Sequence, residues 1–363
     1  MPIVQQFNKS EGALLNASNK DRRKITGVEQ RAHGGKILRD GFQELFNFKE
    51  HRLKVNGICS LQQYEEPKSI TANIKSNWRK EMFLSWDSKN IILWQHDKVH
   101  KLIRFPFSKQ NYINCLVYIQ KLSIFIAATS DLNFDLYDKN LLLVESIKHE
   151  ERAILAMEYN NDSGFIVIAG ALGLSVWRAY RSLNMDMSHV LEKLFTFQES
   201  IPWTNKIVYN STTQGKIYAL VDRSLHIFDI NWRVRVNMLE NIHEASITQC
   251  VWYARSQFYI TSCNQGLIKC YSNIQMNDSF SNQKASKNNN SHSSSLALLH
   301  TFNLHTKAVT GLKLHPTVPG LLISSSLDCT IRVFNLEALT QLFFVHLSSG
   351  INNIQVKFFL NLS

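Results

Sequence analysis

LLISSSLDCTIRVFNLEAL, residues 321–339, places two short apolar segments on either side of a polar break. Asp328 lies in the break, and the aromatic Phe334 follows six residues later. Apolar segments of this length around a turn signal predict two antiparallel β-strands. A hairpin explains one such pattern, and a recurrence along the chain would decide the fold.

The pattern recurs. Six segments align on the aromatic, and their spacings range from 40 to 63 residues. A period of about 40–45 residues is typical of propellers with four short strands per unit. The segments are NIILWQ, LNFDLYD, LGLSVWR, RSLHIFD, GLIKCYS and CTIRVFN, with anchors Trp94, Tyr137, Trp177, Phe228, Tyr271 and Phe334.

Polar residues share the spacing of the anchors. An aspartate stands six residues before three anchors, at Asp131, Asp222 and Asp328. A histidine stands 28 or 29 residues before three anchors, at His149, His243 and His305. His51 begins the same phrase in the first unit.

These units resemble the WD-repeat β-propeller family over roughly residues 41–358. The family's GH phrase stands as EH, KH, IH and LH, and its closing WD as WQ, YD, WR, FD, YS and FN. The resemblance implies an all-β propeller of four-stranded antiparallel blades, with six recognisable repeats plus an incomplete seventh.

The resemblance also implies a structural blade network, in which the loop histidine bonds the turn aspartate through a strand Ser or Thr. In the last repeat His305 would pair with Asp328, with Ser324, Ser325 or Ser326 as the intermediary. The first, second, third and fifth units lack the histidine or the aspartate at the expected place. We expect those blades to depend on packing alone.

Both ends of the chain depart from the repeat. Residues 1–40 are basic and predict a flexible arm before a propeller at 41–363. FQELFNF, residues 42–48, is interpreted as an outer strand that closes the ring against the final blade. TQLFFVH can complete the sixth unit, and INNIQVKFFL predicts the first strand of a seventh, so 340–363 would form an incomplete final blade with an exposed edge.

Composition limits the class of protein. The formal charge of +11 raises nucleic acid, an acidic protein surface or an anionic membrane as partners. The six scattered cysteines form no C-x-x-C pair, so we expect reduced thiols in an intracellular compartment, with no zinc and no other cofactor. No secretory signal and no apolar segment of membrane-spanning length is present, which predicts a soluble chain.

The sequence gives no sign of an enzyme. His305, Asp328 and the neighbouring serines have the residue types of a catalytic triad, but no G-x-S-x-G elbow accompanies them. GALGLS, residues 170–175, lacks the phosphate-loop pattern G-x-x-x-x-G-K-[ST] and predicts a tight turn.

Three insertions are expected to leave the propeller on one face, two of them after the third strand of a blade. They include QQYEEPKSITANIKSNWRK, AYRSLNMDMSHVLEK and an Asn/Ser-rich segment after residue 275. SLNMDMSHVLEKLF, residues 182–195, could form a short helix. Loops on a rigid scaffold often carry binding. Residues predicted to bind partners are Tyr64, Trp78, Met185 and Met187 in the insertions, and Ser130, Glu150, Lys307 and Leu327 beside the turns of the opposite face.

The leading interpretation is a non-enzymatic scaffold or adaptor in a larger intracellular, cytoplasmic assembly, with a slight preference for ciliary or cytoskeletal assemblies. The alternative is a nucleic-acid- or chromatin-associated propeller that uses the basic arm, so a nuclear location stays open.

Overall fold

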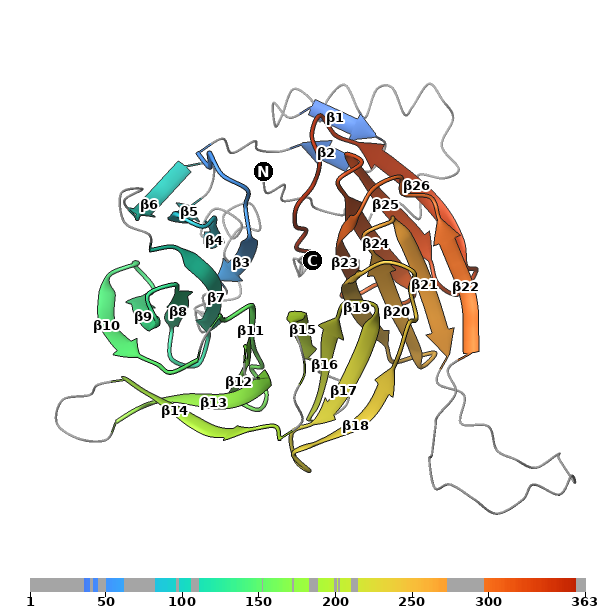
Figure 1. Cartoon of the computed structure of the whole chain (residues 1–363). Coiled ribbons are helices and arrows are strands. Elements are labelled where there is room, and N and C mark those ends of the chain that lie inside the picture. The colour runs from blue at the N-terminus through green and yellow to red at the C-terminus, as the bar shows by residue number, and fades with distance from the viewer. Residues whose placement is uncertain are drawn as a thin grey trace, which may run out of the picture.

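Six four-stranded antiparallel sheets are arranged around a common axis as the blades of a propeller (Figure 1). The structure is a computed structural model. It describes residues 36–39, 42–44, 50–61, 82–95, 98–105, 111–151, 153–171, 173–182, 189–198, 201, 203–209, 215–272 and 297–356. The predicted all-β propeller with four-stranded blades is confirmed.

The strands of each blade follow one another in the chain and are called a to d from the axis outwards. Blade 1 contains β3 (Gly57–Leu61), β4 (Met82–Trp86), β5 (Asn90–Gln95) and β6 (Lys98–Arg104). Blade 2 contains β7 (Ile113–Ile119), β8 (Ile124–Thr129), β9 (Asn133–Asp138) and β10 (Leu143–Lys148). Blade 3 contains β11 (Ala156–Tyr159), β12 (Phe165–Gly170), β13 (Gly173–Arg181) and β14 (His189–Thr196).

The second half of the ring repeats this order. Blade 4 contains β15 (Thr204–Tyr209), β16 (Lys216–Val221), β17 (Ser224–Asp229) and β18 (Val234–Leu239). Blade 5 contains β19 (Ile247–Tyr253), β20 (Phe258–Cys263), β21 (Leu267–Ser272) and β22 (Ala297–Asn303). Blade 6 contains β23 (Val309–Leu314), β24 (Leu321–Ser326), β25 (Thr330–Asn335) and β26 (Thr340–His346).

The core lies between the blades rather than inside any one of them. Each pair of successive blades shares an apolar cluster, so a middle strand is covered on both faces. Every residue of β8 and of β24 is buried for this reason, whereas the outer strands β18 and β26 alternate between exposed and partly buried. Strands covered on both sides lose the period-2 pattern and appear in the sequence as continuous apolar runs.

The aromatic anchors found in the sequence mark a recurring irregularity. In every blade the register between strands c and d shifts at the anchor, as at Trp94 in blade 1 and Phe334 in blade 6. A bulge places two residues of one strand against one of its partner and bends the sheet. The recurring aromatic therefore reports the position of the blade's bend.

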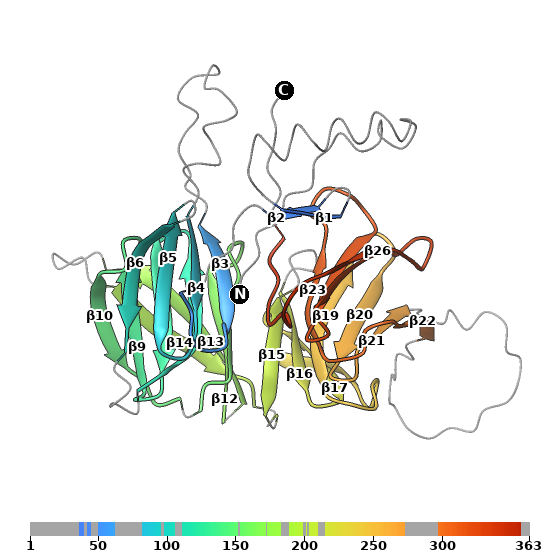
Figure 2. The same cartoon turned by 90° about the horizontal axis from the view of Figure 1, so that it is seen from above.

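Two local predictions were wrong. Residues 189–196 form the strand β14 instead of continuing a helix, because they pair along the whole extended edge of β13. The segment expected to be an outer strand near residue 42 forms β2 (Phe42–Glu44), which pairs with β1 (Lys36–Arg39) in a separate two-stranded sheet beside β26 (Figure 2). β1 falls in the last residues of the predicted arm, and residues 1–35 lie outside the described residues.

The predicted incomplete seventh blade is also corrected. β26 is the outer strand of blade 6, and residues 351–356 form no strand; residues 357–363 lie outside the described residues. The C-terminal segment 347–356 runs between β3 and β23 in both views (Figures 1 and 2). Its Ile351 and Ile354 join the apolar cluster on the free face of blade 6.

Ile351 nevertheless occupies the place of an inner strand's first residue. Its amide donates to the carbonyl of Ser326 at 3.0 Å, as Ile113 donates to Ser88 at 2.9 Å between blades 1 and 2. A β-strand is defined by pairing with a neighbour. Because the described residues supply no strand b beside this segment, it begins like a seventh blade and stays irregular.

Candidate functional site

One face of the propeller carries the b-to-c turns and the d-to-a loops, and is called the turn face. Backbone hydrogen bonds hold each turn against the loop that begins the same blade. Ser130 donates to the carbonyl of Tyr112 at 2.9 Å, and Leu327 donates to that of Ala308 at 3.1 Å. Turn and loop therefore present one continuous surface in these blades. The opposite face carries the a-to-b and c-to-d connections and is called the insertion face.

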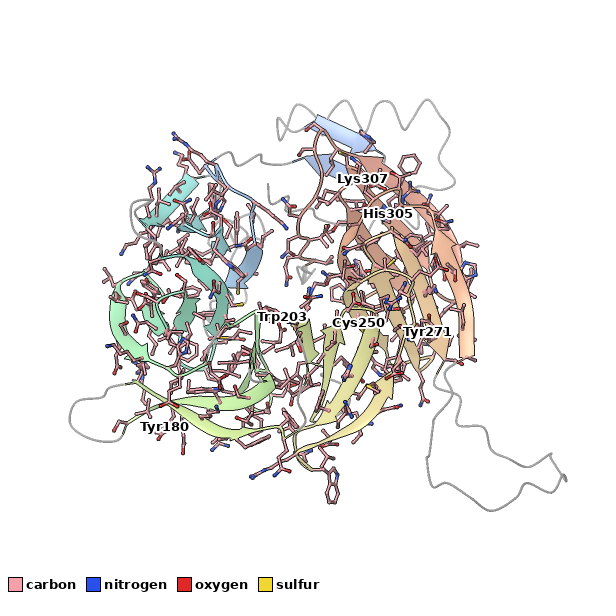
Figure 3. The ribbon with its side chains drawn as sticks, in the orientation of Figure 1. Tyr180, Trp203, Cys250, Tyr271, His305 and Lys307 are labelled. Carbon is pink, nitrogen blue, oxygen red and sulfur yellow. The ribbon has the colours of Figure 1, made fainter. Side chains whose placement is uncertain are left out.

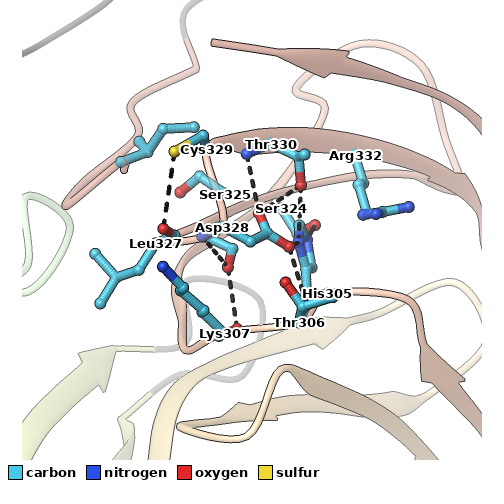
Figure 4. Close-up of polar contacts among 12 residues, drawn as sticks. His305, Thr306, Lys307, Ser324, Ser325, Leu327, Asp328, Cys329, Thr330 and Arg332 are labelled. Carbon is cyan, nitrogen blue, oxygen red and sulfur yellow. Dashed lines mark hydrogen bonds and ion pairs between the residues drawn. The ribbon is translucent and has the colours of Figure 1, made fainter. Parts of the chain in front are cut away.

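Blade 6 contains a polar network under the turn face (Figure 4). His305 Nδ1 lies 2.8 Å from Asp328 Oδ2, and His305 Nε2 lies 2.7 Å from Ser324 Oγ. Thr330 Oγ1 donates to Asp328 at 2.6 Å. Burial would raise the pKa of Asp328, but the bonds from Thr330 and His305 outweigh it and lower the pKa to about 2. The carboxylate is therefore charged at neutral pH and holds Nδ1 of His305 in its protonated form.

Blade 1 contains an equally complete network that the sequence pattern did not predict. His51 Nδ1 lies 2.6 Å from Asp87 Oδ2, and His51 Nε2 lies 2.7 Å from Ser85 Oγ. Trp94 Nε1 donates to the same Ser85 oxygen at 2.7 Å. Asp87 precedes the anchor by seven residues instead of six. A search that allowed the turn to vary by one residue would have found it.

The structure does not join the other predicted network residues in this way. His149 packs its ring against Phe134, with centroids 4.1 Å apart, and makes no hydrogen bond to Asp131. His243 bonds Thr261 at 2.8 Å.

The two remaining aspartates belong to local turns. Asp131 accepts hydrogen bonds from Thr129 and Asn111. Asp222 has an exposed side chain and accepts a bond from Ser246 at 2.5 Å.

The networks of blades 1 and 6 have the residue order of a Ser-His-Asp triad, but a substrate cannot reach their serines. A catalytic serine must reach a substrate carbonyl beside an oxyanion hole. Ser85 and Ser324 are both 0% exposed. Their strands b are covered by neighbouring strands on both sides, so this geometry fixes the turn against the blade.

The turn-face residues predicted to bind partners are spread over several blades. Glu150 and Lys307 are exposed, Leu327 is just exposed, and Ser130 is partly buried. Figure 3 shows Lys307 beside His305 at the top of blade 6. The four residues predicted in the insertions, Tyr64, Trp78, Met185 and Met187, lie outside the described residues.

Two exposed aromatic side chains on the turn face were missed. Tyr112 and Trp203 immediately precede the inner strands β7 and β15. Trp203 is 69% exposed and has a φ of 32°, in the left-handed region that large side chains rarely adopt. Figure 3 places it near the axis of the ring. No periodic pattern could have found it, because it lies between strands.

The inner strands carry a second repeated irregularity just below these loops. Four of them, β7, β15, β19 and β23, shift register against strand b at their second residue. The bulged residue is polar in all four cases: Asn114, Asn205, Thr248 and Thr310. Bulges re-aim side chains and are common near functional sites.

Three inner strands also carry charged side chains. Glu158 on β11, Lys206 on β15 and Lys313 on β23 are each only partly buried, although they belong to innermost strands. Lys206 Nζ donates to Gln249 Oε1 on β19 at 2.5 Å. Burial and the neighbouring Lys313 lower the pKa of Lys206 to about 8, while Glu158 acts in the opposite direction. Burial raises the pKa of Glu158 against the effect of both lysines.

In the described parts of the chain, no group of three His, Cys, Asp or Glu side chains is placed to hold a metal ion. The six cysteines are free. The described residues include no helix that could span a membrane.

Comparison with known proteins agrees with this architecture. Residues 296–335, which cover the outer strand β22 of blade 5 and the first three strands of blade 6, match the family model "WD domain, G-beta repeat". The WD40 β-propeller domain of Doa1 aligns with a TM-score of 0.57 and 14% identity, over 84% of this chain and 86% of that one. The chain is a WD-repeat β-propeller.

This WD-repeat propeller matches no curated protein by sequence. By structure it matches 1519 solved chains, so the fold alone is too widely shared to indicate a partner. Propellers of this kind generally mediate protein–protein interaction.

Proposed function

We propose that this chain is a non-enzymatic scaffold that binds a protein partner on the turn face, around the axis of the ring. The exposed Trp203 carries the proposal. Its side chain contributes little to packing, and its backbone conformation costs about 1–3 kcal/mol of strain energy. Exposed Trp and Tyr side chains on rigid elements are the residues that most often dominate binding energy.

The turn face also exposes apolar side chains on blades 2 and 6. Tyr112 is 46% exposed, Leu132 is 41% exposed and Leu327 is 37% exposed, all on turn-face loops or turns. The polar bulge residues below them could accept or donate hydrogen bonds to a docked chain. Exposed apolar side chains together with a few hydrogen-bonding groups have the mixed composition of protein–protein interfaces. We place this interaction inside the cell, since the free cysteines suit a reducing compartment.

A matched pair of substitutions tests the proposal. Trp203→Ala removes the turn-face aromatic, and Trp232→Ala removes the 77% exposed tryptophan in the c-to-d turn of the same blade, on the insertion face. Tagged full-length protein captures partners from source cells, with washes at physiological and raised salt.

We expect Trp203→Ala to lose partners that Trp232→Ala retains at raised salt. Loss with Trp232→Ala alone would move the interaction to the insertion face. Capture dominated by nucleic-acid complexes that raised salt removes would favour the basic arm, because phosphate contacts weaken steeply with salt.

A further inference from the structure

Three charges on the inner strands form a group that the turn-face proposal does not use. We name Glu158, Lys206 and Lys313 the inner-strand charge cluster. The strands that carry them, β11, β15 and β23, belong to blades 3, 4 and 6. Each lysine acts electrostatically on Glu158, and the lysines also act on each other. The cluster therefore joins the inner strands of three blades and does not lie within one blade.

The cluster is not neutralised by its own members. Two lysines face one carboxylate, and among the described residues no N–O distance within 4.0 Å makes either lysine an ion pair with Glu158. Within the described residues, the hydrogen-bond partner of the Lys206 ammonium is the neutral side-chain amide of Gln249. An excess positive charge thus remains where desolvation makes it costly.

Solvent reaches this charge. All three side chains are partly exposed, which separates them from the fully buried strand b residues one layer outwards. A packed structural ion pair would exclude water and bring opposite charges into contact. A cation pair that is desolvated, unneutralised and accessible has the properties of a binding site for an anion.

We propose that Lys206 and Lys313 form a binding site for a phosphate group. A compact anion placed between two ammonium groups would relieve their repulsion, and lysine binds phosphate as a point charge. Gln249 holds Lys206 in place while its own Nε2 donates to Thr310 O at 2.7 Å. The hydroxyl-bearing Thr248 and Thr310 and the amide of Asn205 lie at the neighbouring bulges. Phosphate is favoured over a carboxylate because its charge of about −1.5 to −2 can be shared between the two ammonium groups.

The same phosphate chemistry could come from a small free ligand or from a phosphorylated side chain of a docked partner. Both require the lysine pair. Only the second source also requires the turn face, so the two sources are separable by experiment. The site itself does not depend on the proposed turn-face interaction.

Binding should be coupled to proton uptake. Lys206, with a pKa of about 8, is roughly half protonated at pH 8, and a bound anion favours its charged form, so about half a proton should enter on binding. The groups that face it are Lys313, Glu158 and Cys250, and Cys59 faces Glu158 in turn. Burial raises the pKa of both thiols to about 12, so neither titrates near pH 8.

The test titrates inorganic pyrophosphate into the full chain at pH 8, by calorimetry in two buffers of different ionisation enthalpy and at constant ionic strength. We expect saturable binding with proton uptake in the wild type. Lys206→Met and Lys313→Met should each weaken binding by ~10-fold or more, and Lys206→Met should abolish the uptake. Lys148→Met removes an exposed lysine at the end of the outer strand β10 as the control and should stay within about 2-fold.

Equal weakening in all three variants would overturn the proposal, since it would show attraction to the net positive surface alone. Absence of saturable binding would overturn it as well. A glycine-flanked phosphoserine peptide provides the second arm. If Trp203→Ala weakens the peptide and leaves pyrophosphate unchanged, a docked phosphoprotein is the source; if it weakens neither, a free phosphate compound is.

Discussion

Gln249 joins two neighbouring blades to its own by accepting a hydrogen bond from Lys206 in blade 4 and donating one to Thr310 in blade 6. Thr310 Oγ1 then donates to the carbonyl of Ile351 at 2.5 Å. A line of polar contacts thus runs from blade 4 to the C-terminal segment. It lies on the inner strands, inward of the apolar clusters that hold the blades together.

Gln249→Leu should destabilise the fold by about 1–3 kcal/mol, because it leaves the buried carbonyl of Thr310 and the Lys206 ammonium without partners. Unfolding in urea, followed by tryptophan fluorescence, measures the effect. Gln265→Leu, at an exposed turn position of the same blade, is the control and should change the free energy of unfolding by less than ~0.5 kcal/mol. Equal effects in the two variants would show that the bridge contributes nothing.

Lys206→Met should change how stability depends on alkaline pH. The folded pKa of about 8 lies below the ordinary value of 10.5, so the unfolded chain binds more protons between these values. Wild-type stability should therefore rise as the pH increases through this range, by about 1–3 kcal/mol for a partly exposed amine. The variant should lack this rise in chemical unfolding at pH 7, 8.5 and 10. A wild-type profile parallel to that of the variant would contradict the lowered pKa.

His243 should make the propeller sensitive to mild acid. Burial and Lys269 lower its pKa from 6.5 to about 4. The folded state keeps His243 neutral where the unfolded chain protonates it, so stability present above pH 6.5 should fall by about 3 kcal/mol as the pH drops towards 4. His243→Gln should remove this part of the pH dependence. His346→Gln, at an exposed position of β26, should leave the profile unchanged in thermal unfolding.

The aspartates of the two complete networks should matter equally. Asp87→Asn and Asp328→Asn should each cost about 3 kcal/mol, because the buried His–Ser chain loses its charged acceptor. Asp162→Asn, at an exposed turn, should have little effect in the same denaturant titration. In the wild type, the stability that Asp328 contributes should be present above pH 4 and be lost as the pH falls towards 2, since its pKa is lowered. If Asp87→Asn leaves the free energy of unfolding unchanged, blade 1 depends on packing alone.

The C-terminal segment can be located by a double-mutant cycle. A Cβ at Gly311 would lie 2.4 Å from Ile354 Cγ2 and 2.5 Å from Ser325 Oγ. Gly311→Ala should therefore cost about 1–3 kcal/mol by overpacking, and Ile354→Ala about 2–4 kcal/mol by leaving a cavity. The double variant should lose about 1 kcal/mol less unfolding free energy than the sum of the two single losses. Simple additivity would mean that Ile354 does not pack there in solution.

The fold could be predicted because repetition makes weak signals agree. No single unit carries both WD letters, yet six aromatics share a spacing, and the structure shows that each marks the bulge between strands c and d. The first-blade network escaped prediction because Asp87 precedes its anchor by seven residues instead of six, which moves it out of register. A fixed-spacing search is blind to that change, although the hydrogen bonds are the same.

The candidate site was harder to predict for a different reason. The inner strands come together only after the ring has formed, and they carry Lys206, Lys313 and, just before β15, Trp203. In the sequence the two lysines belong to blades 4 and 6 and are far apart. The inner-strand bulges follow from pairing with strand b, and hydrophobic periodicity carries no sign of them. Residues that meet across a ring need the ring before they can be recognised.

The C-terminal segment closes the circle without strand pairing. Between blade 6 and blade 1 it offers a hydrogen bond from Asn353 Nδ2 to Asn56 O at 3.4 Å and an apolar contact on one side. Local opening requires less free energy than global unfolding where few backbone bonds must break. This junction is therefore the least stable closure of the ring, and amide hydrogens there should exchange with solvent earlier than those of the central strands. Local opening at this junction would leave the apolar clusters between the successive blades 1 to 6 intact.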